Sequence, residues 1–292
     1  MERVADNIIH NLYVNSESSR LQAIAMRIDF FSQQFLEKPY LSGAQGEGAT
    51  GEFDQSPLYR FDQFDCVTYV NNILALSFSN NLIEFKKNLL KLNYYHAEPI
   101  YQNRFHFMSV DWNPQNQQNG FLKDITTQIK NISGNSIAEF AEGDIDRPSW
   151  FLHRNEKDIK LLQPISADQM KKQVQRLRNL SRVVKKELVR LPYLPLTHLF
   201  GTDHRPREDI FTQIPHGSII EIVRPNWNLK EKIGTHLHVS HMGFLIWEKR
   251  NLFFRHASSD NKRVESVLFT HYLQRYLSSD IVKGIHIQMV IS

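Results

Sequence analysis

The spacing of apolar residues changes once along the chain, near Gly217, and this change restricts the folds that are possible. Four segments before it have the spacing of amphipathic helices, namely residues 18–38, 66–76, 83–92 and 166–190. Four segments after it are rich in Ile, Val and Phe, as strands are, namely residues 218–223, 239–247, 252–256 and 285–291. Helices followed by an antiparallel sheet predict a fold of the α+β class.

The 292 residues are enough for one large or two ordinary domains, and we expect one domain that spans residues 1–292. Its expected parts are a helical N-terminal part (about 1–130), a helical insertion (about 131–215) and a sheet part (about 216–292). Within the N-terminal part, residues 105–110 predict a further strand.

The strongest helical pattern covers residues 166–190, where Ser166 and Gln169 have the spacing of a capping box and Pro192 ends the helix. One face of this helix is apolar. The opposite face is basic and comprises Lys171, Lys172, Arg176, Arg178, Arg182, Lys185 and Lys186. Such a face is usually a solvated surface, and the alternative is a site for an anionic polymer.

The net charge of +4 is compatible with an anionic substrate and does not indicate nucleic-acid binding. No apolar run approaches the roughly 20 residues that span a bilayer, so we expect no membrane span. The N-terminal residues lack the apolar stretch of a signal peptide. We therefore expect a cytoplasmic protein or, if a leader has been removed, a protein of the periplasm or cell envelope.

Cys66 is the only cysteine, so the chain has no internal disulfide. It lies where a Gly-rich segment gives way to an apolar periodic run, directly after Asp65, which is a good N-cap residue type. A thiol in the first turn of a helix is close to free N–H groups that lower its pKa, as in cysteine nucleophiles. The alternative is a small buried hydrophobic residue.

Two histidines on an expected hairpin could supply the base that a cysteine nucleophile needs. If Trp247 opposes Leu252 across the four-residue loop 248–251, then His256 opposes Gly243, and His241 is its diagonal neighbour on the same face. Gly243 would leave space between the two rings. We assign His241 as the base and His256 as the group that orients it.

A zinc site is the competing interpretation, since His236, His238, His241 and His256 are close in sequence or pairing. In a regular strand, however, His236 and His238 would share one face and His241 would lie on the other. We expect no metal and no organic cofactor.

These motifs resemble the NlpC-type cell-wall peptidase superfamily, which has a papain-like fold and a Cys-His-His arrangement. The motifs are Asp-Cys-Val-Thr at 65–68, Ser-His-Met-Gly at 240–243 and His-Ala-Ser at 256–258. The resemblance is closest to the N-acetylmuramoyl-L-alanine amidase-like branch, formerly of unknown function. It extends over residues 39–40, 64–75, 107–112, 124–126 and 217–259. Many relatives have a small residue and Gly where this chain has Val67 and Thr68.

The resemblance implies a papain-like α+β fold, with the nucleophile-bearing helix packed on an antiparallel sheet and with extra helices. It implies hydrolysis of the amide between the muramic lactyl group and L-alanine in peptidoglycan fragments, with anhydro-muropeptides favoured. By motif match, Cys66 is the nucleophile, His241 the base and His256 the third member. Tyr40 matches a tyrosine that approaches the thiol and helps to bind the substrate or oxyanion.

Four further residues are weaker candidates for the substrate or oxyanion site. Asp65 is more simply an N-cap, and Ser240 either binds a polar group of the substrate or ends a ladder. Asp111 and Trp112 could shape a sugar or peptide subsite, although Trp is more often a core residue.

Three other functions stay open from the sequence. The first is an endopeptidase that cuts the D-glutamyl–diaminopimelate bond of the stem peptide. The second is a non-catalytic cell-wall binding module that has kept the fold. The third is a papain-like protease that acts on other proteins, in which Asn often replaces the histidine that this chain has at position 256.

Overall fold

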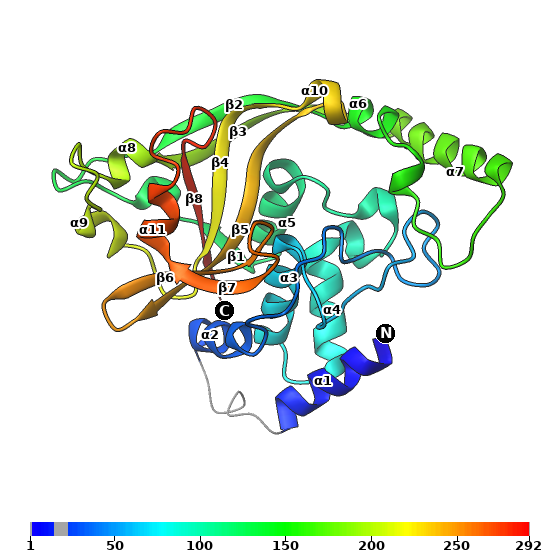
Figure 1. The fold of residues 1–292 in the computed structure, drawn as a ribbon, viewed down its shortest axis with the longest axis horizontal. Coiled ribbons are helices and arrows are strands. Elements are labelled where there is room, and N and C mark those ends of the chain that lie inside the picture. The colour runs from blue at the N-terminus through cyan, green and yellow to red at the C-terminus, as the bar shows by residue number, and fades with distance from the viewer. Residues whose placement is uncertain (1, 15–22, 292) are drawn as a thin grey trace.

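The computed structural model describes residues 2–14 and 23–291, which form helices around a central antiparallel sheet (Figure 1). The sheet has eight strands in the order β2-β3-β8-β4-β5-β6-β7, and β1 pairs with β8. The strands are β1 Leu122–Asp124, β2 Glu139–Asp146, β3 Lys186–Pro195, β4 Ile219–Asn228, β5 His236–Glu248, β6 Asn251–Ser258, β7 Arg263–Leu268 and β8 Gly284–Val290. The predicted α+β class is confirmed.

Helices cover both faces of this sheet. The helices are α1 Glu2–Val14, α2 Ile24–Gln33, α3 Cys66–Ser77, α4 Leu82–Asn93, α5 Asn113–Gln118, α6 Arg147–Leu152, α7 Ala167–Asn179, α8 Leu196–Leu199, α9 Glu208–Phe211, α10 Lys230–Ile233 and α11 Phe269–Gln274. Helices α1–α4 lie on one side of the sheet, and α8, α9 and α11 lie on the other (Figure 1). Within the described residues, no helix is long and apolar enough to cross a membrane.

Strand β5 separates two hydrophobic cores because alternate side chains of a strand point to opposite faces. Met242, Phe244 and Ile246 pack with α2–α4 in one core. Leu245 packs with α9 and α11 in the other. The strand that contains the motif at 240–243 is therefore held from both sides.

Residues 37–40 pair with the free edge of β7, far away in sequence. The N–H of Glu37 donates to the carbonyl of Val264 (2.8 Å), and that of Tyr40 donates to the carbonyl of Lys262 (2.8 Å). A parallel bridge then joins Tyr40 to Phe64, two residues before Cys66. The segment thus connects the sheet edge to the start of α3.

Several predicted elements are confirmed with adjusted bounds. Residues 83–92 correspond to α4, and the four predicted strands correspond to β4, β5, β6 and β8. The predicted helix 18–38 is seen as α2, while its first residues, 18–22, lie outside the described residues. Strands β1, β2, β3 and β7 were not predicted.

The predicted strand at 105–110 is wrong, because a π-helical turn covers Met108–Trp112. The side chain of Asp111 accepts the N–H of Phe107 (2.9 Å), which folds this segment back on itself.

The insertion is not all helical, and the helix predicted for 166–190 is too long. The capping box of Ser166 and Gln169 is confirmed, but α7 ends at Asn179 and Pro192 lies inside β3. Alternate residues of β3, Val189, Leu191 and Tyr193, are buried against β2 and α7. This burial with period two outweighs the helical spacing.

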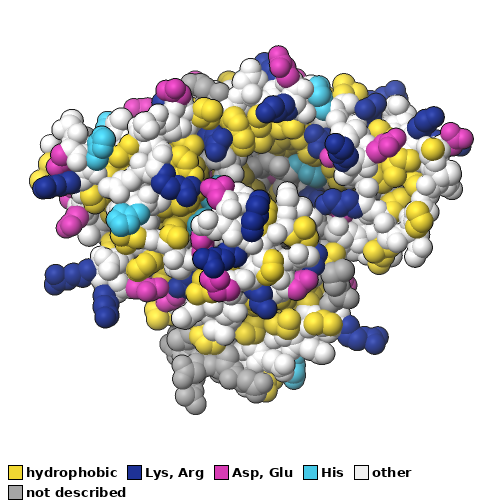
Figure 2. All heavy atoms as spheres, viewed as in Figure 1, with side chains coloured by type: hydrophobic (Ala, Val, Ile, Leu, Met, Phe, Trp, Pro, Cys, Tyr) yellow, Lys and Arg dark blue, Asp and Glu magenta, His cyan; other side chains and the backbone are white. Residues whose placement is uncertain are grey.

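The predicted basic face is therefore divided between α7, a loop and β3. Lys and Arg side chains are prominent over the α7 region (Figure 2), and three of the seven have acidic partners. Lys171 pairs with Asp168 (3.9 Å), Arg176 with Glu52 (3.4 Å) and Lys186 with Asp144 (2.6 Å). These pairs favour the solvated-surface interpretation.

Gly243 is required by the close approach of β5 and β6, and the space predicted beside it is filled. A Cβ atom at Gly243 would lie 2.7 Å from both the carbonyl oxygen of Arg255 and the Cβ of His256. We expect Gly243→Ala to lower the free energy of unfolding by about 1–3 kcal/mol, measured by urea denaturation. Gly201→Ala is the control, because its Cβ would come close only to the exposed side chain of Asp203, which can move, and would lie at an ordinary distance of 3.9 Å from the carbonyl oxygen of Arg205. Equal stability of the two variants would contradict this prediction.

Candidate active site

Asp65 fixes the start of α3 and the loop that precedes it. Its side chain accepts the N–H of Thr68 (2.8 Å), and the hydroxyl of Thr68 accepts the N–H of Asp65 (2.9 Å), which forms a capping box. Its other carboxylate oxygen accepts the N–H groups of Gly43 (3.0 Å) and Ala44 (3.3 Å). The N-cap interpretation is confirmed, and the protein itself uses both carboxylate oxygens.

The thiol of Cys66 begins α3 in a half-buried position. Burial, with a contribution from the Asp65 carboxylate, raises the pKa of Cys66 to about 12. The backbone N–H groups of Met242, Val67 and Cys66 act in the opposite direction. The predicted lowering of the thiol pKa is therefore wrong, because burial and the neighbouring carboxylate raise the pKa by more than the N–H groups at the helix start lower it.

The two histidines meet as the hairpin pattern predicts. Trp247 pairs with Leu252, and this register continues to Phe244 and Arg255, where the ladder ends. Just beyond that end, Nε2 of His241 lies 2.7 Å from Nδ1 of His256.

A β-bulge directs the ring of His241. His241 pairs with Ile222, whereas Val239 pairs with the next residue of β4, so Ser240 is an extra residue in β5. A bulge increases the local twist and redirects the side chains beside it. Ser240 donates its hydroxyl to the carbonyl of Ile222 (3.3 Å) and borders the same cavity as His241.

The regular strand that would put His236 and His238 on the face opposite His241 is not present, because the bulge at Ser240 interrupts β5. His238 is buried, and its ring lies against Gly143 of β2, away from the His241–His256 pair. Within residues 2–14 and 23–291, no group of three His, Cys, Asp or Glu residues is arranged to hold a metal ion.

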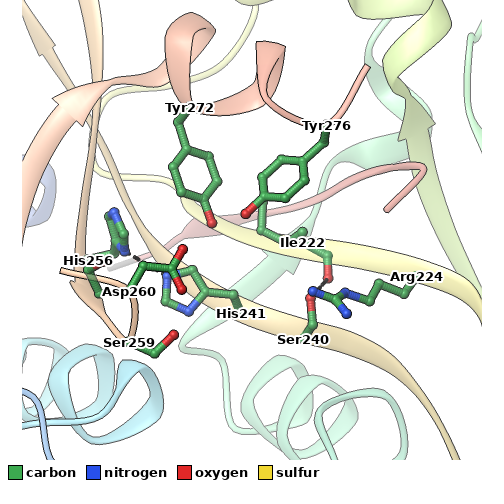
Figure 3. Close-up of a pocket in the computed structure, with 10 residues that line it drawn as sticks. Ile222, Arg224, Ser240, His241, His256, Ser259, Asp260, Tyr272 and Tyr276 are labelled. Atoms are coloured by element: carbon green, nitrogen blue, oxygen red, sulfur yellow. Dashed lines mark hydrogen bonds between the residues drawn. The ribbon is translucent and has the colours of Figure 1, made fainter. Parts of the chain in front are cut away.

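A small polar cavity of about 100 Å³ opens beside the two histidines (Figure 3). Its lining is Ile222, Arg224, Ser240, His241, His256, Ser258, Ser259, Asp260, Tyr272 and Tyr276. In Figure 3 the hydroxyl groups of Tyr272 and Tyr276 point toward the side where His241 and Asp260 lie. This volume equals that of roughly three water molecules, so it can enclose one amide group and not a whole glycopeptide.

Both imidazoles are neutral at pH 7. Burial lowers the pKa of His241 to about 4, with Arg275 and Arg224 acting in the same direction and Asp260 against it. Burial, with contributions from His241 and Arg275, lowers the pKa of His256 to about 2. Arg224, Asp260, Tyr272 and Tyr276, which line the same cavity, were not predicted from the sequence. The four-residue spacing of the two tyrosines is the one signal that could have grouped them.

Tyr40 lies near the thiol. Burial raises the pKa of Tyr40 to about 12, and the next largest contributions come from Cys66 and Asp65. The ring is held at the sheet edge by the backbone contact with Lys262, whose ammonium lies 5.9 Å from its centroid.

The proposed subsite of Asp111 and Trp112 is wrong. Trp112 is fully buried, and its indole N–H donates to the side-chain oxygen of Asn71 (2.8 Å), so no ring face is free to stack on a sugar. Asp111 is buried too and accepts the hydroxyl of Tyr95 (2.9 Å) beside the guanidinium of Arg147.

The structure makes no direct link between the thiol and the imidazoles. In the part of the chain that it describes, neither histidine has a hydrogen bond to Cys66. Helix α3 packs against Met242, whereas His241 faces Tyr272 on the other side of β5. The backbone N–H of Met242 lowers the pKa of the thiol, so Cys66 lies beside Met242, the residue after His241. A contact between Cys66 and His241 stays a prediction.

Comparison with known proteins identifies the family. The model of the AmiA-like family, described as N-acetylmuramoyl-L-alanine amidase-like, matches residues 30–280. The chain belongs to this family. A search of curated proteins finds no match.

Three solved structures have a similar fold. A protein from Legionella pneumophila str. Philadelphia 1 is 39% identical, with a TM-score of 0.95 over 100% of this chain and 96% of its own. An N-acetylmuramoyl-L-alanine amidase from Bacteroides uniformis is 21% identical, with a TM-score of 0.64 over 92% of this chain and 99% of its own. A putative xylanase from Bacteroides fragilis is 22% identical, with a TM-score of 0.58 over 89% of this chain and 99% of its own. The last two identities are low enough that they show the fold alone.

The raised pKa of Cys66 predicts slow alkylation at neutral pH. We expect the rate of iodoacetamide labelling, measured by mass spectrometry, to increase about tenfold per pH unit from pH 7 to 10, because only the thiolate reacts. Asp65→Asn keeps a good N-cap and removes the carboxylate that raises this pKa, so it should react faster at each pH. A rate that levels off below pH 8 in the unmodified protein would show that the thiol pKa is not raised.

Proposed function

We propose that this protein is a cysteine amidase that hydrolyses the N-acetylmuramoyl–L-alanine bond of peptidoglycan fragments, with anhydro-muropeptides favoured. The observation on which this rests most is the 2.7 Å contact between Nε2 of His241 and Nδ1 of His256. It occupies one nitrogen of His241 and leaves Nδ1 as a base. Membership of the amidase-like family supports an amide of peptidoglycan as the substrate.

The proposed arrangement is papain-like, with Cys66, His241 and His256 as a triad. With a thiol pKa near 12 and an imidazole pKa near 4, the resting pair is neutral. His241 therefore acts as a general base at the moment of attack, and no preformed ion pair is required. The mechanism requires Nδ1 of His241 to reach the thiol, a contact that the structure does not show. Nδ1 then takes the thiol proton while the sulfur forms a bond to the amide carbonyl carbon.

The oxyanion that forms would accept hydrogen bonds from two groups. One is the backbone N–H of Cys66 at the start of α3, where helix amides point toward negative charge. The other is the hydroxyl of Tyr40, which lies near the thiol. Tyr40 is held by its pairing with the edge of β7, and the N–H of Cys66 is held by the capping box of Asp65 and Thr68.

Bond cleavage and hydrolysis follow from the same imidazole. His241, now protonated, donates to the nitrogen of L-alanine as the C–N bond breaks, and the peptide leaves with a free amine. The muramoyl group is then a thioester on Cys66. His241 next removes a proton from water, which attacks the thioester and releases the lactyl carboxylate and the thiol.

Arg224 is suited to an anionic group of the peptide. Its guanidinium lies over the ring of Trp227 (4.6 Å) at the border of the cavity. Its Nε atom is buried and has no hydrogen bond among the described residues. A carboxylate of the stem peptide would supply the missing acceptor.

Replacement of Cys66 tests the reaction. We expect Cys66→Ala to lower the rate of amine release from a muramoyl-peptide by about 10³-fold or more, since the acyl-enzyme cannot form. Circular dichroism and thermal unfolding control for folding. Equal rates in parent and variant would exclude the cysteine mechanism.

Mass spectrometry of the products tests the bond. Free anhydro-muramoyl sugar and intact peptide support the amidase. A sugar that retains L-alanyl-D-glutamate would instead show the endopeptidase, and binding without any product would show a non-catalytic module.

Replacement of Arg224 tests the anionic contact. We expect Arg224→Gln to raise KM by about tenfold with little change in kcat, since one charge-assisted hydrogen bond contributes roughly 1.5–3 kcal/mol. The measurement is steady-state kinetics with muramoyl-peptides that have a free or an amidated carboxylate. A variant that still distinguishes the two substrates would contradict this role.

A further inference from the structure

His256 has a ring nitrogen that the proposed triad does not use. Nδ1 contacts His241, while Nε2 is buried and has no hydrogen bond among the described residues. The nearest charged group recorded for it is Glu265, whose Oε1 lies 3.6 Å away. Both side chains are largely buried, with exposed fractions of 3% for His256 and 10% for Glu265.

Strand pairing places Glu265 beside His256. The two residues are direct partners across β6 and β7, so their side chains lie on the same face. Asn261 donates its amide to both carboxylate oxygens of Glu265, at 2.8 and 2.9 Å, and Nε of Arg263 lies 4.0 Å from Oε2. The carboxylate is therefore fixed in position and faces the unused nitrogen of His256.

Only two proton arrangements are possible for the neutral histidine pair. In the first, His241 donates from Nε2 to Nδ1 of His256, so His256 has its own proton on Nε2, facing Glu265. In the second, His256 donates from Nδ1, so the lone pair of its Nε2 faces a carboxylate, and Nδ1 of His241 is protonated and cannot be a base. A carboxylate attracts an N–H and repels a lone pair, which favours the first arrangement.

We propose that Glu265 is a positioning residue that sets the tautomers of both histidines and so leaves Nδ1 of His241 free to act as the base. The catalytic part of this inference rests on the proposed function, whereas the tautomers are a property of the folded protein. The present 3.6 Å separation is slightly too long for a hydrogen bond. Hydrogen bonds of this kind are often long without substrate and shorten in the complex.

Glu265 also has an electrostatic effect on the reaction. When His241 takes the thiol proton, the positive charge develops on an imidazole that donates to His256, which in turn faces Glu265. The negative charge stabilises this state. Asp260, Arg275 and Arg224 are the charged groups that shift the pKa of resting His241, and replacement of Glu265 leaves all three in place.

Nuclear magnetic resonance of ¹⁵N-histidine-labelled protein tests the tautomers directly. We expect the proton on Nε2 in both His241 and His256 of the unmodified protein, with the signals assigned from His241→Gln and His256→Gln spectra. In Glu265→Leu, which removes the acceptor, we expect His256 to shift toward the Nδ1–H form. A proton on Nδ1 of His256 in the unmodified protein would overturn the proposal without any variant.

Kinetics of Glu265→Gln test the charge, and Glu37→Gln is the matched control. Glu37 pairs with the same Arg263 (2.7 Å) but is exposed and does not contact a histidine. Loss of the Glu265 charge removes a group that stabilises the protonated form of the base during the reaction. We therefore expect the acid limb of kcat/KM to move to lower pH and kcat to fall about 10- to 100-fold, with KM little changed. Glu37→Gln should leave both unchanged.

The two proposals fail in different ways. If Cys66→Ala keeps full activity while both histidines have Nε2 protons, the cysteine mechanism is wrong and the tautomer assignment stands. If Cys66→Ala is inactive but Glu265→Gln has the kcat and pH profile of Glu37→Gln, the role of Glu265 is wrong and the amidase mechanism stands.

Discussion

The pairing of β5 with β6 is the constraint on which the rest of the site depends. It ends at Phe244 and Arg255, so that His241 and His256 meet where the two strands separate. Gly243 permits this approach because any larger residue would collide with the backbone of β6. The bulge at Ser240 directs His241, and β7 places Glu265 on the far side of His256. If the register of the hairpin changed by one residue, the two histidines would lie on opposite faces of the sheet and none of these contacts could form.

Burial has opposite consequences for the two partners of the proposed reaction. It raises the pKa of the Cys66 thiol and lowers that of the His241 imidazole, so each group is kept in its uncharged form. A thiol of this kind reacts slowly with small electrophiles at neutral pH. In the proposed mechanism the thiol loses its proton only as it attacks a bound substrate, which limits side reactions of the thiol.

The sequence was sufficient where short-range rules determine the structure. The alternation of β5 and β6 gave the correct pairing of Trp247 with Leu252, although Glu248 and Asn251 also pair, so the loop has two residues and not the four predicted. Asp65 was correctly predicted as the N-cap of α3. The sequence was insufficient where the position or the pKa of a residue depends on how deeply the fold buries it. Trp112 is a core residue and not a sugar platform, and the thiol pKa is raised by surroundings that come from distant segments. Strand β3 has alternate apolar residues, but the charged residues between them, such as Arg190, also fit the exposed face of a helix. Only the pairing with β2 decides between a strand and a helix here.

The contact of residues 37–40 with β7 joins parts of the chain that are more than 200 positions apart. Contacts of such high contact order form late in folding, because the entropy of closing a long loop must be overcome first. This closure holds Tyr40 and, through the bridge from Tyr40 to Phe64, the segment before α3. A nascent chain that ends before β5 has the thiol without the two histidines, so the proposed site is complete only after the C-terminal strands have folded.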